Sequence, residues 1–200
     1  MEYSIIYADP PWSYKDKRGN NPTWGAMTYP TMLVDEIKAL PVQQIAADNC
    51  MLFLWATFPL LQEGLDVIKA WGFKYKTSGF LWVKTNKRQD LEQVSFFPAE
   101  PDLFFGIGYY TKSNCEVCLI GVRGKPIKKS DCVSSVVIAP ISRHSQKPDE
   151  VRQRIVEFCG DVPRIELFAR QKVDGWDSIG FDIDGCNIKE SLEKAVWKGK

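Results

Sequence analysis

The residues best suited to chemistry in this sequence are Ala8-Asp9-Pro10-Pro11-Trp12, which directly follow a short apolar segment, residues 3–7. The segment has the composition of a buried strand, and proline, which has no backbone N–H, ends it. The strand therefore ends in a carboxylate and carbonyl oxygens on a stiff backbone beside an indole ring. These acceptors suit a flat, amine-bearing ligand, because ligands of open α/β sheets bind at the carboxyl ends of strands. The simpler interpretation is a strand and a Pro-Pro turn, with Asp9 in solvent and Trp12 packed.

Length and composition restrict the class of protein. We expect one domain over residues 1–200, with a core of about residues 3–176 and a tail of about 177–200. The formal net charge of +1 excludes a polycation that coats nucleic acid non-specifically. The longest apolar run, residues 50–61, is too short to span a membrane. Six cysteines with no signal peptide ahead of them predict reduced thiols, so we expect a soluble, cytoplasmic protein that makes no membrane contact.

Cys115-Glu116-Val117-Cys118 is the one cysteine pair with the spacing of zinc ligands. The sequence has no second such pair and no pair of histidines, and the segment continues as an apolar strand. Buried thiols are therefore favoured over a metal site, and no metal is expected.

Short apolar segments alternate with segments of helical periodicity along the chain. The expected strands are residues 3–7, 51–56, 80–83, 117–122, 136–139 and 164–169. The expected helices start at Pro30, Pro59 and Pro148, with a short one at about residues 188–197. Several strands are apolar throughout, as in strands covered on both faces. This order predicts an α/β fold with a mostly parallel sheet and helices on both faces.

Basic side chains follow four of the expected strands, in the loops after Tyr7, Val83, Val122 and Ala139. In a parallel sheet these loops meet at the carboxyl edge, which also holds Asp9. The first two loops also carry several aromatic residues, and cations interleaved with rings suit a phosphate backbone and stacked bases. Each cluster taken singly is better explained as a charged surface loop, but their coincidence favours a nucleic-acid-binding edge.

Asp9-Pro10-Pro11-Trp12 resembles the D-P-P-W signature of S-adenosylmethionine-dependent methyltransferases that act on the exocyclic amine of adenine. Further segments match the MT-A70-like family in order: Tyr29-Pro30-Thr31-Met32, Leu52-Phe53-Leu54-Trp55, Trp82-Val83-Lys84-Thr85-Asn86, Cys118-Leu119-Ile120-Gly121-Val122-Arg123-Gly124, Lys147-Pro148-Asp149-Glu150 and Ile165-Glu166-Leu167-Phe168-Ala169-Arg170. The match runs from about residue 3 to residue 176, and the ordered series is more specific than the signature alone. The chain is thus similar to a bacterial or phage member of this family.

The resemblance implies a Rossmann-like methyltransferase fold with permuted motif order, in which the catalytic strand precedes the cofactor-binding one. The implied cofactor is S-adenosylmethionine, and the implied catalytic residues are Asp9, Pro10, Pro11 and Trp12. Asp9 and the Pro10 carbonyl would accept hydrogen bonds from the adenine amine, so that catalysis rests on positioning and fixed electrostatics. A base in a duplex would have to be flipped out of the stack.

The resemblance also implies two sets of binding residues. The cofactor set, with Glu166 at the ribose, is Asp9, Lys147, Glu166, Leu167, Phe168 and Arg170. The substrate set is Trp12, Tyr29, Lys84, Asn86, Arg143 and His144, with Trp12 or Tyr29 stacked on the base. For His144, the only histidine, a substrate-side or structural role is preferred over that of a catalytic base.

The sequence departs from the family pattern in two places. No cofactor-contacting Asp-hydrophobic pair precedes the signature strand, because the sequence starts at Met1. Gly180 is followed by Phe181 and Asp182, where the family usually has Asn-Gln or Asn-Glu. We therefore expect weak binding of the cofactor's adenosyl end.

The expected function is methylation of the exocyclic amine of adenine in DNA, in the form of a site-specific methyltransferase. RNA is the alternative substrate, since only the compact form without added domains favours DNA. Transfer to another planar amine and a non-catalytic nucleic-acid-binding subunit are further alternatives, and the intact signature argues against the second. A homodimer or a partner subunit is compatible with the sequence.

Overall fold

Seven strands of this chain form one sheet. The structure is a computed structural model that describes residues 2–13, 31–87, 102–106, 108, 110–126, 128–142 and 146–197. The strands are β1 (Tyr3–Ala8), β2 (Ala46–Ala56), β3 (Lys74–Thr85), β4 (Cys115–Arg123), β5 (Val136–Pro140), β6 (Arg164–Leu167) and β7 (Asp177–Ile179). The α-helices are α1 (Val34–Lys38), α2 (Leu61–Ala70), α3 (Glu150–Cys159), α4 (Phe181–Asp184) and α5 (Ile188–Trp197). Two 3-10 turns, Val42–Gln44 and Phe58–Leu60, complete the described elements.

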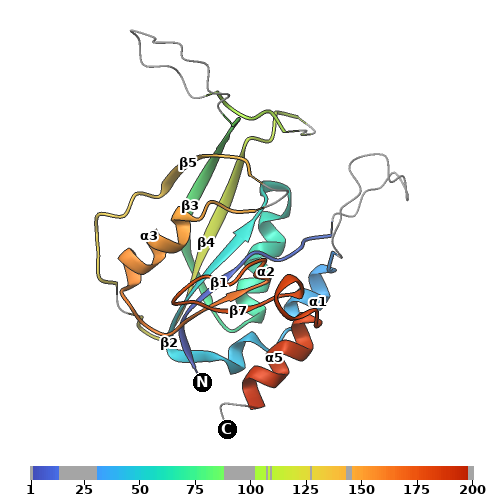
Figure 1. The fold of residues 1–200 in the computed structure, drawn as a ribbon, viewed down its shortest axis with the longest axis vertical. Coiled ribbons are helices and arrows are strands. Elements are labelled where there is room, and N and C mark those ends of the chain that lie inside the picture. The colour runs from blue at the N-terminus through green and yellow to red at the C-terminus, as the bar shows by residue number, and fades with distance from the viewer. Residues whose placement is uncertain are drawn as a thin grey trace.

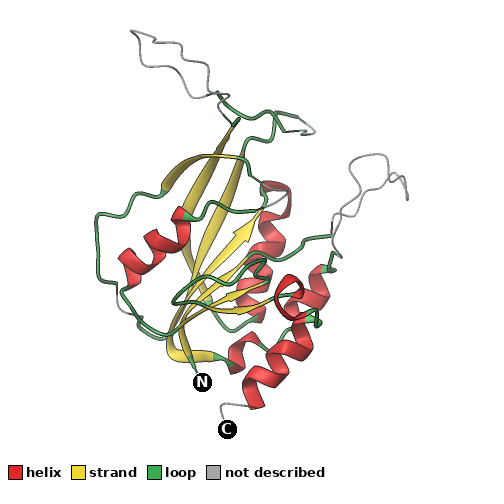
Figure 2. Ribbon diagram, in the orientation of Figure 1, coloured by secondary structure: helices red, strands yellow, loops and turns green. Residues whose placement is uncertain are grey.

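The strands follow the order β5-β3-β4-β2-β1-β6-β7 across the sheet. Only β4 is antiparallel to its neighbours, β2 and β3, and all other pairs are parallel. Figure 1 shows the twisted sheet with β1 near its middle, and Figure 2 shows the helices that flank it. The mostly parallel α/β fold expected from the sequence is confirmed, and it is Rossmann-like.

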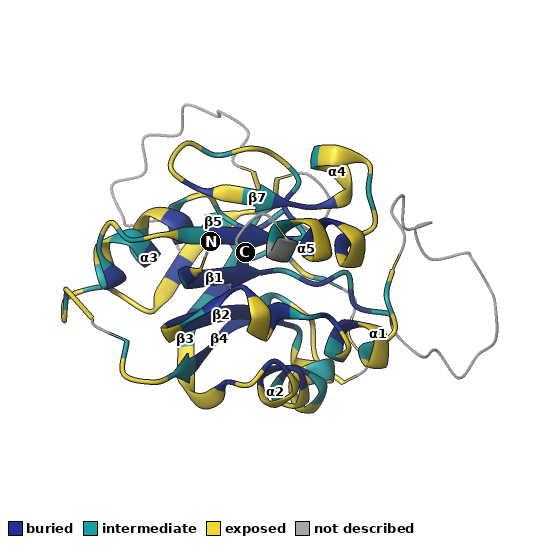
Figure 3. Ribbon diagram, turned by 90° about the horizontal axis from the view of Figure 1, so that it is seen from below, coloured by how far each residue is buried: buried dark blue, intermediate teal, exposed yellow. Residues whose placement is uncertain are grey.

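Helices cover both faces of the sheet, as expected. On one face, Ile37 of α1, Ile68 of α2 and Leu192 of α5 share a core cluster with Ile6 of β1. On the other face, α3 packs into a second cluster with Ile5 and Tyr7 of the same strand. Figure 3 shows the buried sheet between these layers. From Ile5 to Ala8 the side chains of β1 alternate between the two clusters, as the pleat requires.

The order of the strands determines where ligands bind in such a sheet. From β1 the chain crosses to β2 on one side, and it later returns from β5 to β6 on the other side of β1. Ligands of open α/β sheets bind at such a switch point, outside the carboxyl ends of the strands. The residue that follows β1 is Asp9.

Two expectations from the sequence are wrong. The basic loop after Val122 does not lie at the edge that holds Asp9, because β4 runs antiparallel. Arg123 instead donates hydrogen bonds to the carbonyls of Gln43 and Ala46, at the start of β2. The tail contains more regular structure than its one expected helix, since β7 pairs with β6 and α4 follows it. The sheet therefore extends past the expected core boundary at residue 176.

No helix in the described part of the chain has the length and apolar composition needed to cross a membrane. The two cysteines of the Cys115-Glu116-Val117-Cys118 segment both lie in β4, Cys118 buried and Cys115 half-buried. Burial raises the pKa of the Cys118 thiol. Among the described residues, no group of three or more His, Cys, Asp or Glu side chains is placed to hold a metal ion.

Candidate active site

The signature residues are anchored at the centre of the sheet edge. Ala8 pairs with Leu54 of β2 and Leu167 of β6, so Asp9 leaves β1 between the ends of both neighbours. The backbone that follows is tied to Met32, whose N–H donates to the Pro11 carbonyl at 2.8 Å and whose carbonyl accepts from Ser13 at 3.0 Å. The signature is therefore held from both sides on rigid backbone.

Trp12 lies in the core. Its Nε1–H donates to the Trp55 carbonyl at 3.1 Å, and the side chain is buried. Trp55 in turn donates to the Tyr7 hydroxyl at 2.7 Å. Trp12 lines neither of the cavities described below, so its ring fixes the turn after Asp9 and is not presented for stacking.

Four side chains of alternating charge, Asp9, Lys147, Glu116 and Lys84, form a continuous row along this edge. The Lys147 ammonium lies 2.8 and 2.7 Å from the two carboxylate oxygens of Asp9, and its side chain is only 5% exposed. It also lies 3.2 Å from Glu116, which accepts from Lys84 at 2.5 Å. We call these four residues the charge row. Because both Asp9 oxygens meet one cation, the carboxylate is fixed in orientation.

The pKa values within the charge row depend on burial and on the neighbouring charges. Burial raises the pKa of Asp9 more than the Lys147 ammonium lowers it, so this pKa lies above its usual range. Burial alone would lower the pKa of Lys147, but the Asp9 and Glu116 carboxylates outweigh it and raise the pKa. For Glu116, Lys147 and Lys84 outweigh burial and lower the pKa. The pKa values of the two carboxyl groups thus shift in opposite directions, upward for Asp9 and downward for Glu116.

Replacing Glu116 with glutamine tests this row. The Glu116 charge contributes to the raised pKa of Asp9, so its removal should lower that pKa and shift the acidic limb of the pH–activity profile to lower pH. Turnover should also fall, by up to about a hundredfold, because Lys147 loses one of the carboxylates that position it. Steady-state rates between pH 4 and pH 9 check this expectation. Glu63→Gln, on α2, is the matched control and should leave the profile unchanged. An unshifted acidic limb in Glu116→Gln would exclude the coupling.

A second buried ion pair lies beside the charge row. Glu166 of β6 accepts two hydrogen bonds from Arg152 of α3, at 2.7 and 2.8 Å, and both side chains are less than a tenth exposed. The Arg152 guanidinium lies 5.8 Å from the centre of the Tyr7 ring and also contacts Asp149 at 2.6 Å. Burial raises the pKa of Glu166, and Arg152 opposes this.

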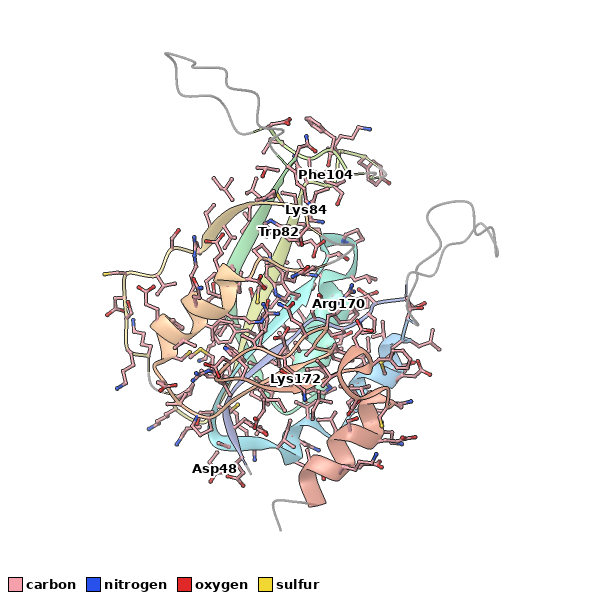
Figure 4. The ribbon with its side chains drawn as sticks, in the orientation of Figure 1. Asp48, Trp82, Lys84, Phe104, Arg170 and Lys172 are labelled. Carbon is pink, nitrogen blue, oxygen red and sulfur yellow. The ribbon has the colours of Figure 1, made fainter. Side chains whose placement is uncertain are left out.

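Two cavities meet at Asp9. The smaller, of about 160 Å³, is rich in charged side chains; it is lined by Tyr7, Asp9, Gln146, Lys147, Arg152, Glu166, Phe168, Arg170, Gln171 and Asp182. The larger, of about 590 Å³, lies between the segment from Thr31 to α1 and the segment from α4 to the start of α5. Four residues line both cavities: Asp9, Phe168, Arg170 and Asp182. Arg170 is labelled near the middle of the molecule in Figure 4.

Local backbone geometry shapes the junction of the cavities. Phe168 has a φ of 62°, a left-handed conformation that costs a non-glycine residue about 1–2 kcal/mol. Gly180 packs so closely against Ala169 that a Cβ would lie 2.6 Å from the Ala169 nitrogen. This contact brings the next turn, with Asp182, against both cavities, whereas Phe181 lines only the larger and is 59% exposed.

The structure brings most of the expected cofactor residues together. Five of the six line the smaller cavity, while Leu167 is fully buried in the core and lines neither cavity. Of the expected substrate residues, Lys84 belongs to the charge row, and Asn86 donates to the Asp102 carboxylate at 3.0 Å. Tyr29, Arg143 and His144 lie outside the described residues.

Sequence reasoning missed Glu116 and Arg152. Glu116 is the second residue of β4, and it reaches the edge that holds Asp9 only because β4 runs antiparallel to β2 and β3. For Arg152 a signal existed, because Glu166 within an apolar strand needs a partner when it is buried. That partner is Arg152, and it comes from the helix immediately before the strand.

The chemistry of the smaller cavity fits S-adenosylmethionine. That molecule carries a carboxylate, an ammonium group, ribose hydroxyls and a sulfonium. The cavity offers the cations Lys147 and Arg170 and the carboxylates Asp9, Glu166 and Asp182. Its volume of about 160 Å³ is small for a whole cofactor, but the four shared residues connect it with the larger cavity.

Comparison with known proteins identifies the family. The model of the MT-A70 family matches residues 3–182. Type II methyltransferase M.MunI of Mycoplasma sp is 31% identical over the whole of this chain, which covers 85% of that protein. Human N(6)-adenosine-methyltransferase catalytic subunit METTL3 is 27% identical over 98% of this chain, which covers only 31% of METTL3. The chain therefore belongs to the MT-A70 family of S-adenosylmethionine-dependent adenine-N6 methyltransferases.

Proposed function

We propose that this protein, as a single methyltransferase domain, methylates the N6 amine of adenine in DNA. The observation that carries the proposal is the Asp9 carboxylate, fixed by Lys147 at the point where two cavities meet. Methyl transfer requires that the methyl donor and the base bind next to each other, with hydrogen-bond acceptors beside the amine of the base. The geometry around Asp9 provides such a site on rigid backbone.

The extent of the similarity supports DNA over RNA. The chain covers 85% of M.MunI, which is named a type II methyltransferase, a class that modifies DNA. It covers 31% of human METTL3 and 25% of the rice protein named probable N(6)-adenosine-methyltransferase MT-A70-like, so the similarity to each of these proteins is limited to a smaller share of its length.

Asp9 and Pro10 would act on the hydrogens of the adenine amine. This amine is a weak nucleophile because its lone pair is delocalised into the ring. Acceptors placed at its two hydrogens favour a pyramidal nitrogen, whose lone pair is free to attack. The Asp9 carboxylate is one acceptor; the Pro10 carbonyl already accepts the Trp12 N–H at 2.9 Å and keeps a second lone pair. Electrostatic positioning of this kind provides much of the rate in many enzymes.

The proton balance requires no strong base. S-adenosylmethionine supplies an electrophilic methyl group, bound to a positively charged sulfur. The methylated amine is cationic and strongly acidic until it loses one proton. Asp9 lies beside it, and burial raises the pKa of this carboxyl, which makes it a better proton acceptor than an exposed aspartate. A stacked base must be flipped out of the duplex to reach Asp9, at a cost of a few kcal/mol.

A nucleoside assay on mixed substrates tests the proposal. The purified protein is incubated with S-adenosylmethionine and single-stranded DNA, duplex DNA or RNA of the same sequence, and the digested nucleosides are separated by mass spectrometry. We expect N6-methyladenine in DNA at a higher initial rate than in RNA. Faster methylation of RNA would overturn the choice of DNA, and methylation of cytosine alone would overturn the choice of adenine.

A further inference from the structure

A described segment between β3 and β4 extends the sheet beyond the edge that holds Asp9. It comprises residues 102–106, 108 and 110–114, here called the aromatic extension. Backbone hydrogen bonds tie it to the end of β3: Asn86 N–H to the Asp102 carbonyl at 2.9 Å, Phe104 N–H to the Lys84 carbonyl at 2.9 Å, and Lys84 N–H to the Asn114 carbonyl at 2.8 Å. Figure 4 places Phe104 beyond Lys84 and Trp82, away from Asp48 at the opposite edge.

The extension presents aromatic rings to solvent. Phe105 is 64% exposed and Tyr110 is fully exposed, while Phe104 is half-buried. Two exposed lysines accompany them, Lys112 in the extension and Lys87 at the end of the chain segment that follows β3. Exposed aromatic rings grouped with cations are typical of surfaces that bind a partner.

Two parts of the extension's backbone lie in close contact, which gives the aromatic rings a defined position. Ser113 N–H donates to the Gly106 carbonyl at 3.1 Å, and the two residues form an antiparallel bridge. A Cβ on Gly106 would collide with the Ser113 carbonyl oxygen, so only glycine permits this approach. The backbone that carries Phe105 is thus fixed against the strand that leads back into β4.

Lys84 connects the extension with the catalytic carboxylate. Its backbone pairs with the extension on both sides, and its side chain contacts Glu116 at 2.5 Å. Glu116 lies 3.2 Å from Lys147, which holds Asp9. When a nucleic-acid substrate places its target base at Asp9, the neighbouring nucleotides can therefore reach the extension.

We propose that the aromatic extension holds the substrate strand beside the target adenine, with Phe105 and Tyr110 stacked on unpaired flanking bases and Lys87 and Lys112 at phosphates. This inference rests on the proposed function and adds the substrate contact that it lacks. Every base has a π-face, so such stacking is tolerant of sequence and favours single-stranded or locally opened DNA. A second copy of this chain is a poorer occupant, because a two-fold contact through this patch would bring its lysines toward each other.

Binding of a fluorescent single-stranded oligonucleotide tests the proposal without any need for turnover. The double variant Phe105→Ala/Tyr110→Ala should weaken binding by at least about tenfold, since stacking contributes about 1–3 kcal/mol per base. Its turnover at saturating oligonucleotide and its KM for S-adenosylmethionine should be unchanged. Lys112→Ala should lower the slope of log K against log salt by about 0.7, the value for one phosphate on a single strand. Tyr75→Ala, an exposed aromatic at the start of β3, is the matched control and should bind as wild type does.

The outcomes separate this proposal from the proposed function. Unchanged binding by a folded double variant, or equally weak binding by the conservative variant Phe105→Tyr/Tyr110→Phe, which keeps both rings, would overturn the extension's role while leaving methylation intact. If light scattering shows that the wild type is a dimer and the double variant a monomer, while both bind the oligonucleotide equally, the patch would be a contact with a second copy. That result would also overturn the proposal. A third outcome combines two results: the wild type methylates no adenine, and the double variant binds the oligonucleotide more weakly than the wild type. This outcome would support the extension's role and refute the proposed function.

Discussion

Replacing Asp9 with asparagine is expected to reduce turnover by at least about a hundredfold, the usual loss when a preorganised electrostatic contact to the reacting centre is removed. The amide keeps the shape of the carboxylate but loses its charge, and its NH2 group would meet the donors of the adenine amine. Lys147 keeps Glu116 as a partner at 3.2 Å, so the charge row does not collapse. Single-turnover methylation at saturating S-adenosylmethionine measures the loss.

Cofactor binding separates a catalytic effect from a structural one. Calorimetric titration should give the Asp9→Asn variant an affinity for S-adenosylmethionine within a few fold of wild type. Asp48→Asn is the matched control, because Asp48 is an exposed aspartate at the opposite edge of the sheet and its variant should retain full turnover. Full turnover by Asp9→Asn itself would remove Asp9 from the mechanism.

Replacing Arg152 with methionine should destabilise the fold strongly. The change leaves the Glu166 carboxylate buried in β6 without its bidentate partner, and breaking a buried ion pair from one side costs about 3–5 kcal/mol. Urea unfolding followed by circular dichroism gives the free energy of unfolding. We expect a lower midpoint, and a partial recovery of stability as pH falls and Glu166 takes up a proton.

The double variant Arg152→Met/Glu166→Gln shows whether the loss comes from the unpaired charge. It should be more stable than Arg152→Met alone, because a neutral amide is less costly to bury than a carboxylate. Lys38→Met, which removes one ion-pair partner of exposed Asp35 on α1, is the control for loss of a surface ion pair and should unfold as wild type does. Equal stability of the single and double variants would show that Arg152 stabilises the protein through packing instead.

Local patterns in the sequence were enough to predict most of the sheet and the position of Asp9. The apolar run before Asp9 and the proline after it define β1 and its end, whatever the rest of the chain does. The direction of a strand could not be predicted in this way, because the apolar pattern of β4 is compatible with either a parallel or an antiparallel strand. The loop after Val122 was therefore placed at the wrong edge, and Glu116 was overlooked for the same reason. Three-residue β7 is defined by its pairing with β6, which local sequence does not contain.

The residues of the candidate site were predictable where they belong to a segment that matches the family pattern. Lys147, Glu166 and Arg170 come from the far half of the chain, and they meet Asp9 around the smaller cavity as the family pattern implies. Their partners were not predictable, since Lys147 is bound to Asp9 and Glu116, and Glu166 to Arg152. Trp12 shows the opposite case: an indole beside the signature suggested stacking on a base, but burial and the hydrogen bond to Trp55 place it in the core.

The most direct test of this account follows one labelled methyl group. DNA is incubated with S-adenosylmethionine that carries a deuterated methyl, in parallel with the wild type and with Asp9→Asn, and the nucleosides are analysed by mass spectrometry. The account predicts N6-methyladenine with the full mass of the label from the wild type, and almost none from a variant that still binds the cofactor. Label on N6 at equal rates with both proteins, or no labelled adenine from a wild type that binds the cofactor, would contradict it.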